Sequence, residues 1–325
     1  MTASHNAGGP NGDFGVKYNI SNGGAAPEAV TNAIFDRTLQ IDQYLIDNSF
    51  PTVDVSQVGR FEEGGMIIDV VDPAEAHVEL LKNIFDFPRL KSFLAESRMR
   101  LVYDGMHGVA GPTARRVFVE ELSLDESCLA NCVPQPDFAG GHPDPNLTYA
   151  HDLVECMGLG RSQPASVPDF GAAADGDMDR NMILGANFFV TPSDSVAIIA
   201  AYAKKCIPYF MKNGLSGVAR SMPTSGALDR VAAAEKLDLF ETPTGWKFFG
   251  NLLDAGKISI CGEESFGTGA DHVREKDGMW AVLAWLSIIE YCNRNVKEFV
   301  SVKSIVEEHW RKYGRNYYTR YGNKE

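Results

Sequence analysis

The sequence from residue 192 to 261 alternates between segments with helical periodicity and short apolar segments typical of strands. Because this alternation places strands side by side and helices across their faces, it favours a sheet held between two layers of helices. The expected helices span 192–211, 225–236 and 246–255, and the expected strands span 217–220, 238–241 and 257–261. This stretch alone predicts an α/β fold.

Two proline residues mark expected helix starts. Pro73 follows Asp72 and Pro192 follows Thr191, so in each pair a capping side chain precedes proline at the first helical position. The remaining expected strands are 14–20, 66–71, 98–103, 170–174, 181–185 and 316–321. The remaining expected helices are one that starts at Pro27 with Val30, Ile34, Ile41 and Leu45 on one face, and those at 113–122, from about 148, 277–291 and 296–312.

The totals limit the class of protein. A chain of 325 residues is longer than one hydrophobic core usually accommodates, so two or three α/β domains are expected. A net charge of −13 disfavours a nucleic-acid partner. The six cysteines lack regular or CxxC spacing, which predicts reduced thiols in a cytoplasmic protein. The longest apolar run, around 196–203, is too short to span a bilayer, so no membrane partner is expected.

Three aspartates occur at alternate positions directly after the apolar run 170–174: Asp175, Asp177 and Asp179. A turn that contains Gly176 can bring their carboxylates onto one ion. Oxygen ligands without His or Cys favour Mg²⁺ over Zn²⁺. Asp and Gly are also the commonest residues of surface turns, so these residues alone leave a cation site and an acidic surface turn equally open.

Three further loops follow strands or precede helices, where ligands gather in open α/β sheets. Residues 241–247 offer a hydroxyl, a glycine and a lysine before a helix N-terminus, which suits an oxyanion or simply a connection. Residues 261–269 place two adjacent acids and a hydroxyl among glycines, which suits a polyol but is common in surface loops. The charged run 271–277 most simply indicates a solvated helix start, although its lysine could act in proton transfer.

The first twelve residues are small and polar without a charge run or repeat, which indicates a functional loop. Ser4 and His5 are adjacent there, but no nucleophile elbow or Ser-His-Asp order supports a hydrolase. Together with a Mg²⁺ site at the three aspartates, the Ser4 hydroxyl suggests a phosphoserine, because phosphate oxygens are preferred Mg²⁺ ligands.

Four loops in order resemble the signature loops of the α-D-phosphohexomutases, most closely those of the phosphoglucomutase branch. They are Thr-Ala-Ser-His-Asn with Gly-Gly-Pro-Asn-Gly-Asp-Phe-Gly at 2–15, Asp-Gly-Asp-Met-Asp-Arg at 175–180, Thr-Pro-Thr-Gly-Trp-Lys at 242–247 and Gly-Glu-Glu-Ser-Phe-Gly at 262–267. The resemblance covers essentially the whole chain. It implies consecutive three-layer α/β/α domains with mixed sheets.

The resemblance also implies roles for individual residues. Ser4 would carry the phosphoryl group, and a phosphoserine oxygen with Asp175, Asp177 and Asp179 would hold one Mg²⁺. The other implied site residues are His5 and Lys276 for proton transfer and phosphate contact, and Lys17, Arg180, Thr244, Gly245, Glu263 and Ser265 for substrate binding.

The implied reaction is an intramolecular phosphotransfer between glucose 1-phosphate and glucose 6-phosphate through glucose 1,6-bisphosphate. A hexose phosphate is the expected partner, and we expect a monomer. Two alternatives stay open, a non-catalytic scaffold protein and, less favoured by the sugar loop, a phosphomannomutase. The first is favoured by Ala7, where the family usually has proline, and by Met178, where it usually has glycine.

The expected division of the chain follows the family's four domains. Residues 1–79 would be the second half of the first domain, with the phosphoserine loop. Residues 80–192 would form the domain with the metal loop, 193–310 the domain with the sugar loop, and 311–325 a linker into a fourth domain. No Arg-x-Ser-Gly-Thr run of the phosphate-clamping loop occurs, so we expect a truncated chain, with Met1 internal to a longer protein and with uncertain activity alone.

Overall fold

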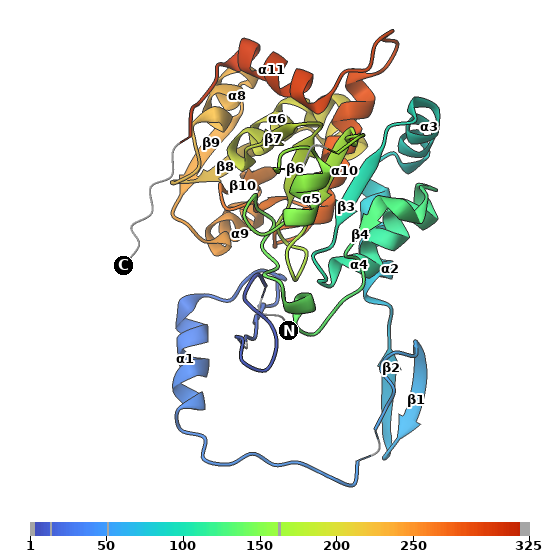
Figure 1. Ribbon diagram of the computed structural model, residues 1–325. Helices are drawn as coiled ribbons and strands as arrows, with labels where there is room; N and C mark the ends of the chain where they lie inside the picture. Colours follow the sequence, from blue (N-terminus) through green and yellow to red (C-terminus); the bar gives the residue numbers. More distant parts are fainter. Residues whose placement is uncertain (1–3, 14, 51, 162–163, 319–325) are drawn as a thin grey trace.

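The computed structural model describes residues 4–13, 15–50, 52–161 and 164–318. Two α/β units lie together in the upper part of Figure 1, and residues 15–70 extend below them. The predicted α/β class, with mixed sheets and helical layers, is confirmed. Within the described residues, no helix is both long and apolar enough to cross a membrane.

Residues 15–70 hold few elements. Helix α1 spans Glu28–Thr38, and the antiparallel hairpin comprises β1 (Gly59–Glu63) and β2 (Met66–Val70). The predicted helical face was wrong for Ile41 and Leu45, which follow the end of α1. The predicted strand 14–20 was also wrong over 15–20, where a single bridge joins Asn19 to Ala25; Phe14 lies outside the described residues. A strand needs a paired neighbour, and this segment pairs only with itself.

The middle unit is a five-stranded mixed sheet in the order β4-β3-β5-β6-β7. Strands β4, β3 and β5 run parallel, whereas β6 and β7 continue antiparallel. Its strands are β3 (Leu101–Asp104), β4 (Leu129–Ala130), β5 (Phe170–Ala173), β6 (Met182–Gly185) and β7 (Phe188–Val190). Its helices are α2 (Pro73–Ile84), α3 (Phe87–Ser97), α4 (Ala110–Ala114), which continues as the π-helical η1 (Arg115–Glu121), and α5 (His151–Cys156).

The third unit is a four-stranded sheet in the order β11-β10-β8-β9, in which only β11 runs antiparallel. Its strands are β8 (Gly217–Ser221), β9 (Asp238–Thr242), β10 (Ile260–Gly262) and β11 (Thr268–Ala270). Its helices are α6 (Pro192–Cys206), α7 (Pro208–Asn213), α8 (Ala227–Glu235), α9 (Trp246–Asp254), α10 (Gly278–Cys292) and α11 (Val302–Tyr313). The predicted tail strand is absent from 316–318, and residues 319–321 lie outside the described residues.

The two predicted caps are confirmed and fix where their units begin. Asp72 accepts a hydrogen bond from the backbone of Ala74 at 2.8 Å, directly before α2. Thr191 accepts one from the backbone of Asp194 at 3.3 Å, directly before α6. Each cap satisfies an N–H group that a helix start leaves unpaired.

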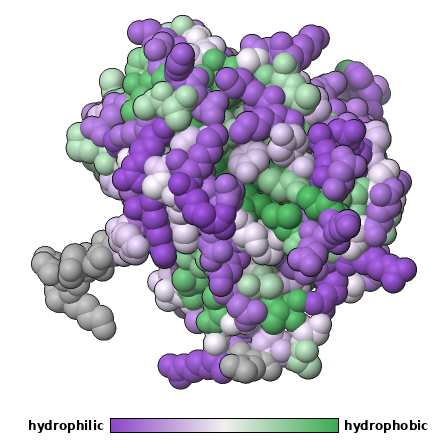
Figure 2. All heavy atoms as spheres, turned by 90° about the horizontal axis from the view of Figure 1, so that it is seen from above, coloured by the Kyte–Doolittle hydropathy of each residue, from purple (hydrophilic) through white to green (hydrophobic). Residues whose placement is uncertain are grey.

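Helix α10 joins the two units. Its residues from Gly278 to Glu290 are all buried, because it packs on α6 and β11 of its own unit and on α3 of the middle unit. Trp280 and Trp285 are fully buried there, and burial of each such side chain stabilises the fold by about 2–3 kcal/mol. Figure 2 views the molecule from above. Hydrophilic side chains cover most of this face and surround a hydrophobic area near its middle.

Helix α1 has no comparable packing. None of its residues is buried, and Phe35 keeps 61% of its surface exposed. Helices of this length are marginal without tertiary contacts, so we expect its amides to exchange with solvent deuterium almost as fast as in an unfolded peptide. Hydrogen exchange followed by mass spectrometry should show this for 28–38, while 278–290 stay protected. Equal protection of both helices would contradict the expectation.

A buried histidine makes stability dependent on pH. His309 of α11 is 3% exposed and packs against Tyr313, and burial together with the charge of Lys312 lowers the pKa of His309 to about 4. The unfolded chain, with a His pKa of about 6.5, binds the proton first as pH falls. Stability is therefore complete above that pH and declines towards pH 4.

We expect the free energy of unfolding to drop by about 2 kcal/mol between pH 7 and pH 5 on account of this group. Urea unfolding at both pH values should show that His309→Leu removes this part of the pH dependence. His142→Leu is the matched control, because His142 also packs against a tyrosine, Tyr149, but is less buried. An unchanged pH dependence in His309→Leu would show that the group does not titrate as described.

Candidate functional site

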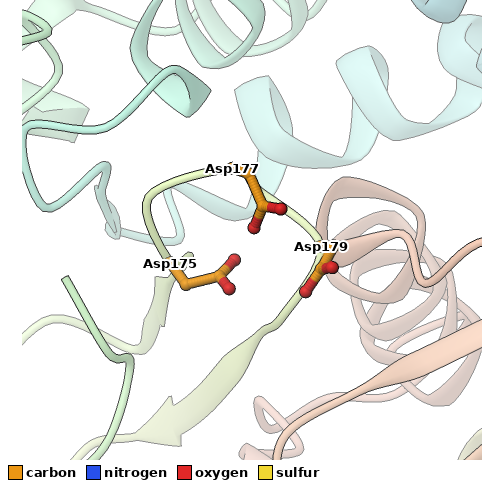
Figure 3. A group of neighbouring side chains, drawn as sticks. All are labelled: Asp175, Asp177 and Asp179. Atoms are coloured by element: carbon orange, nitrogen blue, oxygen red, sulfur yellow. The ribbon is translucent and has the colours of Figure 1, made fainter. Parts of the chain in front are cut away.

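Three aspartates converge in the loop that follows β5. Figure 3 shows the carboxylates of Asp175, Asp177 and Asp179 pointing towards one another, and one oxygen of each lies within 4.8 Å of the others. Asp175 is 0% exposed and Asp179 is 6% exposed, so the alternative of an acidic surface turn is wrong. Buried carboxylates this close form a candidate site for a hard cation.

The turn geometry is tight. Gly176 approaches the opening loop so closely that a Cβ atom there would lie 2.2 Å from the backbone oxygen of Ser4. Met178 adopts a φ of 66°, a conformation that costs a non-glycine residue about 1–2 kcal/mol. Methionine is therefore strained at residue 178, where glycine would be the less strained choice.

Ser4 reaches the aspartates from the other end of the chain. Its hydroxyl donates to Asp177 Oδ1 at 3.0 Å and lies 3.2 Å from Asp175 Oδ2. His5 Nδ1 lies 3.3 Å from the same hydroxyl. Burial, followed by the charge of Arg180, lowers the pKa of His5, so its imidazole is neutral at neutral pH. Thr2 and Ala3 of this loop lie outside the described residues.

Two lysines neutralise part of the acidic cluster. Lys17 Nζ lies 2.7 Å from Asp177 Oδ2 and 2.8 Å from Asp179 Oδ2. Lys276 Nζ lies 3.0 Å from Asp179 Oδ1. Both lysines predicted for the site therefore meet its carboxylates, from positions far apart in the sequence.

The carboxylates are not equivalent. Burial, followed by the negative charges of Asp179 and Asp177, raises the pKa of Asp175 well above its usual value. Burial also acts on Asp177, but the ammonium of Lys17 outweighs it and lowers the pKa of Asp177 to about 2. A divalent cation bound there would favour the ionised form of Asp175, which burial and the neighbouring carboxylates disfavour.

The backbone joins the aspartate loop to the loop 262–267. Arg180 and Gly267 form an antiparallel bridge, and the backbone N–H of Asn181 donates to Phe266 at 2.9 Å. The Arg180 side chain donates to Asp144 at 3.2 Å, a partner that lies 36 residues away and was not predicted from the sequence. The aspartate loop of the middle unit and the loop 262–267 of the third unit are therefore in direct contact.

The loop 242–247 meets the same region. The backbone N–H of Gly245 donates to Glu263 Oε1 at 3.2 Å, and burial raises the pKa of Glu263. Thr244 is exposed beside Gly245, and Ser265 is half-buried two residues after Glu263. The predicted sugar-binding residues thus gather on two adjoining loops of the third unit.

A cavity of about 470 Å³ opens beside Asp177 and Asp179 and is also lined by Lys276, His77 and His272. Neither histidine was predicted as a site residue. His77 belongs to α2 and meets Asp277 across 200 residues of sequence, and His272 was noted only as part of the charged run 271–277. The 271–277 run is not the solvated helix start that its charges indicated, since Asp277 is only 5% exposed.

Asp277 organises this side of the cavity. Its Oδ2 lies 2.7 Å from His77 Nε2 and 2.9 Å from His272 Nε2, and its Oδ1 accepts from the backbone of Trp280 at 2.8 Å. Burial opposes the charged forms of His77 and Asp277. Their mutual attraction outweighs it, so the pKa of His77 is raised and the pKa of Asp277 is held well below its usual range. The ion pair fixes the residue next to Lys276.

Sequence models of one family match three parts of the chain. They are described as phosphoglucomutase/phosphomannomutase alpha/beta/alpha domains I, II and III, and they match residues 1–45, 75–187 and 191–313. The cytoplasmic phosphoglucomutases of Bromus inermis and Solanum tuberosum are each 61% identical over 99% of the chain. The chain spans 56% of the length of each of these relatives.

Solved structures agree with the sequence comparison. The phosphoglucomutase pp63/parafusin of Paramecium, in its open form, superposes with a TM-score of 0.89 at 52% identity, covering 96% of this chain and 56% of that one. A putative phosphomannomutase of Thermus thermophilus, at 24% identity and a TM-score of 0.73, shares the fold over 96% of this chain and 62% of its own length. The chain belongs to the phosphoglucomutase/phosphomannomutase family.

Proposed function

We propose that this chain interconverts glucose 1-phosphate and glucose 6-phosphate through a phosphorylated Ser4 and glucose 1,6-bisphosphate. The observation that carries the proposal is the Ser4 hydroxyl, which lies 3.0 and 3.2 Å from two of the three clustered carboxylates. The 61% identity to the cytoplasmic phosphoglucomutase of Bromus inermis supports glucose phosphates as the substrates and the cytoplasm as the location.

The aspartate cluster fits a magnesium ion. Its donors are all oxygens, as Mg²⁺ prefers, and one oxygen of each carboxylate lies within 4.8 Å of the others. Asp175, Asp177 and Asp179 would hold the ion together with a phosphoserine oxygen. When bound, the ion supplies positive charge to the transferring phosphoryl group.

The reaction consists of two balanced transfers. In the first, the bond between phosphorus and Ser4 Oγ breaks, the free hydroxyl of the hexose phosphate forms the new bond, and the sugar loses a proton while Ser4 gains one. The second transfer returns the other phosphoryl group of the bisphosphate to Ser4. We assign proton transfer at Ser4 to His5, whose Nδ1 lies 3.3 Å away, and proton transfer at the sugar to Lys276.

The remaining predicted residues would bind the substrate. Glu263 and Ser265 offer acceptors and a hydroxyl to the sugar, and Thr244 and Gly245 adjoin them. Arg180 and Lys17 supply positive charge for phosphate. Either phosphate of the bisphosphate must be able to face Ser4, so the sugar binds in two orientations. Contacts between short loops and the sugar hydroxyls suit both orientations.

The test uses glucose 1,6-bisphosphate carrying a radioactive phosphate, Mg²⁺ and the purified chain, with any longer natural form that contains it assayed in parallel. We expect label on Ser4, located by mass spectrometry, and conversion of glucose 1-phosphate in an assay coupled to glucose 6-phosphate oxidation. Conversion without phosphate on Ser4 would contradict the proposed mechanism. Failure of every form to convert either phosphate would contradict the proposed function.

A further inference from the structure

Lys17 lies where a cation would be expected to contact the aspartate loop. Its single ammonium group bridges Asp177 Oδ2 and Asp179 Oδ2, at 2.7 and 2.8 Å. The other oxygens are engaged differently, since Ser4 lies against Asp175 Oδ2 and Asp177 Oδ1, and Lys276 contacts only Asp179 Oδ1. Among the residues that the structure describes, Lys17 is the one that forms ion pairs with two of the three carboxylates.

An ammonium group and a divalent cation compete for these oxygens. Mg²⁺ binds carboxylate oxygens at about 2.0–2.1 Å and accepts little distortion of its octahedral geometry. Two positive charges drawn to the same pair of oxygens also repel each other strongly in a partly buried site. An ion held by Asp177 and Asp179 therefore requires the Lys17 ammonium to move.

Lys17 can move without loosening its segment. The Lys17 side chain keeps 35% of its surface exposed, and the aliphatic part of a lysine is flexible. Two residues on, Asn19 holds the segment by donating to Glu275 Oε1 at 2.8 Å. The backbone N–H of Ala26 also donates to the carbonyl of Tyr18 at 3.1 Å. Displacement of the ammonium costs the two ion pairs but leaves these anchors in place.

We propose that Lys17 is an internal competitor of the divalent cation, which occupies Asp177 and Asp179 before metal binds and is released when it does. The inference rests on the proposed function, because it takes the cation to be Mg²⁺. With Lys17 in place, the site discriminates between cations by their charge. A monovalent ion gains no more Coulomb energy from the two carboxylates than the resident ammonium does. Release links metal loading to a free cationic side chain beside Ser4, where the phosphoryl group is handled.

The experiment measures Mg²⁺ binding to the chain by isothermal titration calorimetry, without any sugar phosphate. We expect Lys17→Gln to bind Mg²⁺ about five- to tenfold more tightly than the unmodified chain, because no ion pair has to be displaced. Lys17→Arg, which keeps the positive charge, should bind no more tightly than the unmodified chain.

Lys82→Gln is the matched control. Lys82 also bridges two carboxylates, Glu79 at 2.9 Å and Glu121 at 3.1 Å, with the same 35% exposure, but these carboxylates belong to α2 and η1 and not to the aspartate loop. Its Mg²⁺ affinity should equal that of the unmodified chain. Equal or weaker Mg²⁺ binding in Lys17→Gln overturns the inference and leaves the proposed function intact. Absence of Mg²⁺ binding in both the unmodified chain and Lys17→Gln overturns both.

A second measurement needs no variant. Amine acylation read by mass spectrometry should modify Lys17 more slowly than Lys82 in metal-free protein, and saturating Mg²⁺ should raise the rate at Lys17 several-fold while Lys82 stays constant. A Lys17 rate that Mg²⁺ leaves unchanged or lowers would show that the ammonium stays in place, and would overturn the inference even if the substituted chains fail to fold.

Discussion

Replacement of Ser4 by alanine is expected to reduce interconversion of the glucose phosphates at least about 10³-fold, because the group that accepts and returns the phosphoryl group is lost. The substitution removes one hydroxyl from a half-buried loop, so the fold should persist. The measurement is turnover in a coupled assay with Mg²⁺ and glucose 1,6-bisphosphate, in the longest natural form of the protein that is active.

Ser49→Ala serves as the control for this prediction. Ser49 also donates its hydroxyl to an aspartate, Asp47, at 2.6 Å, but on an exposed turn. Its removal should leave turnover unchanged. Undiminished turnover in Ser4→Ala would exclude phosphoserine chemistry at this residue, whatever the aspartates bind.

Asp277→Ala is expected to destabilise the fold by about 3–5 kcal/mol, because it leaves buried partners without their shared acceptor. The carboxylate is 5% exposed and lies against two imidazoles and the start of α10. Urea unfolding followed by tryptophan fluorescence should report the loss directly, since Trp280 packs on His272.

The pH dependence gives an independent check on this ion pair. Because Asp277 raises the pKa of His77, the part of the stability due to His77 is complete below about pH 6.5 and is lost as pH rises through the raised value. Asp277→Ala should abolish that decline. The control is Asp254→Ala, since Asp254 pairs with Arg274 at 2.6 Å on the exposed surface and should matter far less. Similar losses from both substitutions would show that the buried pair has no special weight.

The α/β alternation could be predicted from the sequence because its elements are long enough for their periodicity to be seen. β8 and β9 fall within one residue of the predicted strands, and the start of α9 coincides with its prediction. The missed strands are β1, with five residues, and β4, β7 and β11, with two or three residues each. Such strands exist because a neighbouring strand pairs with them, which local sequence does not reveal.

The candidate site divides in the same way. The aspartates follow one another in a single loop, so their convergence could be predicted locally, whereas the contact of Lys17 with Asp177 spans 160 residues and that of His77 with Asp277 spans 200. Ser4 was placed beside the aspartates by the family resemblance, and the distances agree with it. The roles of the site residues and the division at residues 79, 192 and 310 stay predictions.

The bridge between Arg180 and Gly267 has a consequence for how the site can change over time. Backbone bonds set most of the contact between the aspartate loop and the loop 262–267, and the side-chain amide of Asn181 adds a hydrogen bond to the Phe266 carbonyl at 3.1 Å. Substitutions of other side chains in either loop can therefore change the chemical groups that the loops present without changing the spacing between them. Side-chain chemistry and loop spacing can therefore vary independently at this contact.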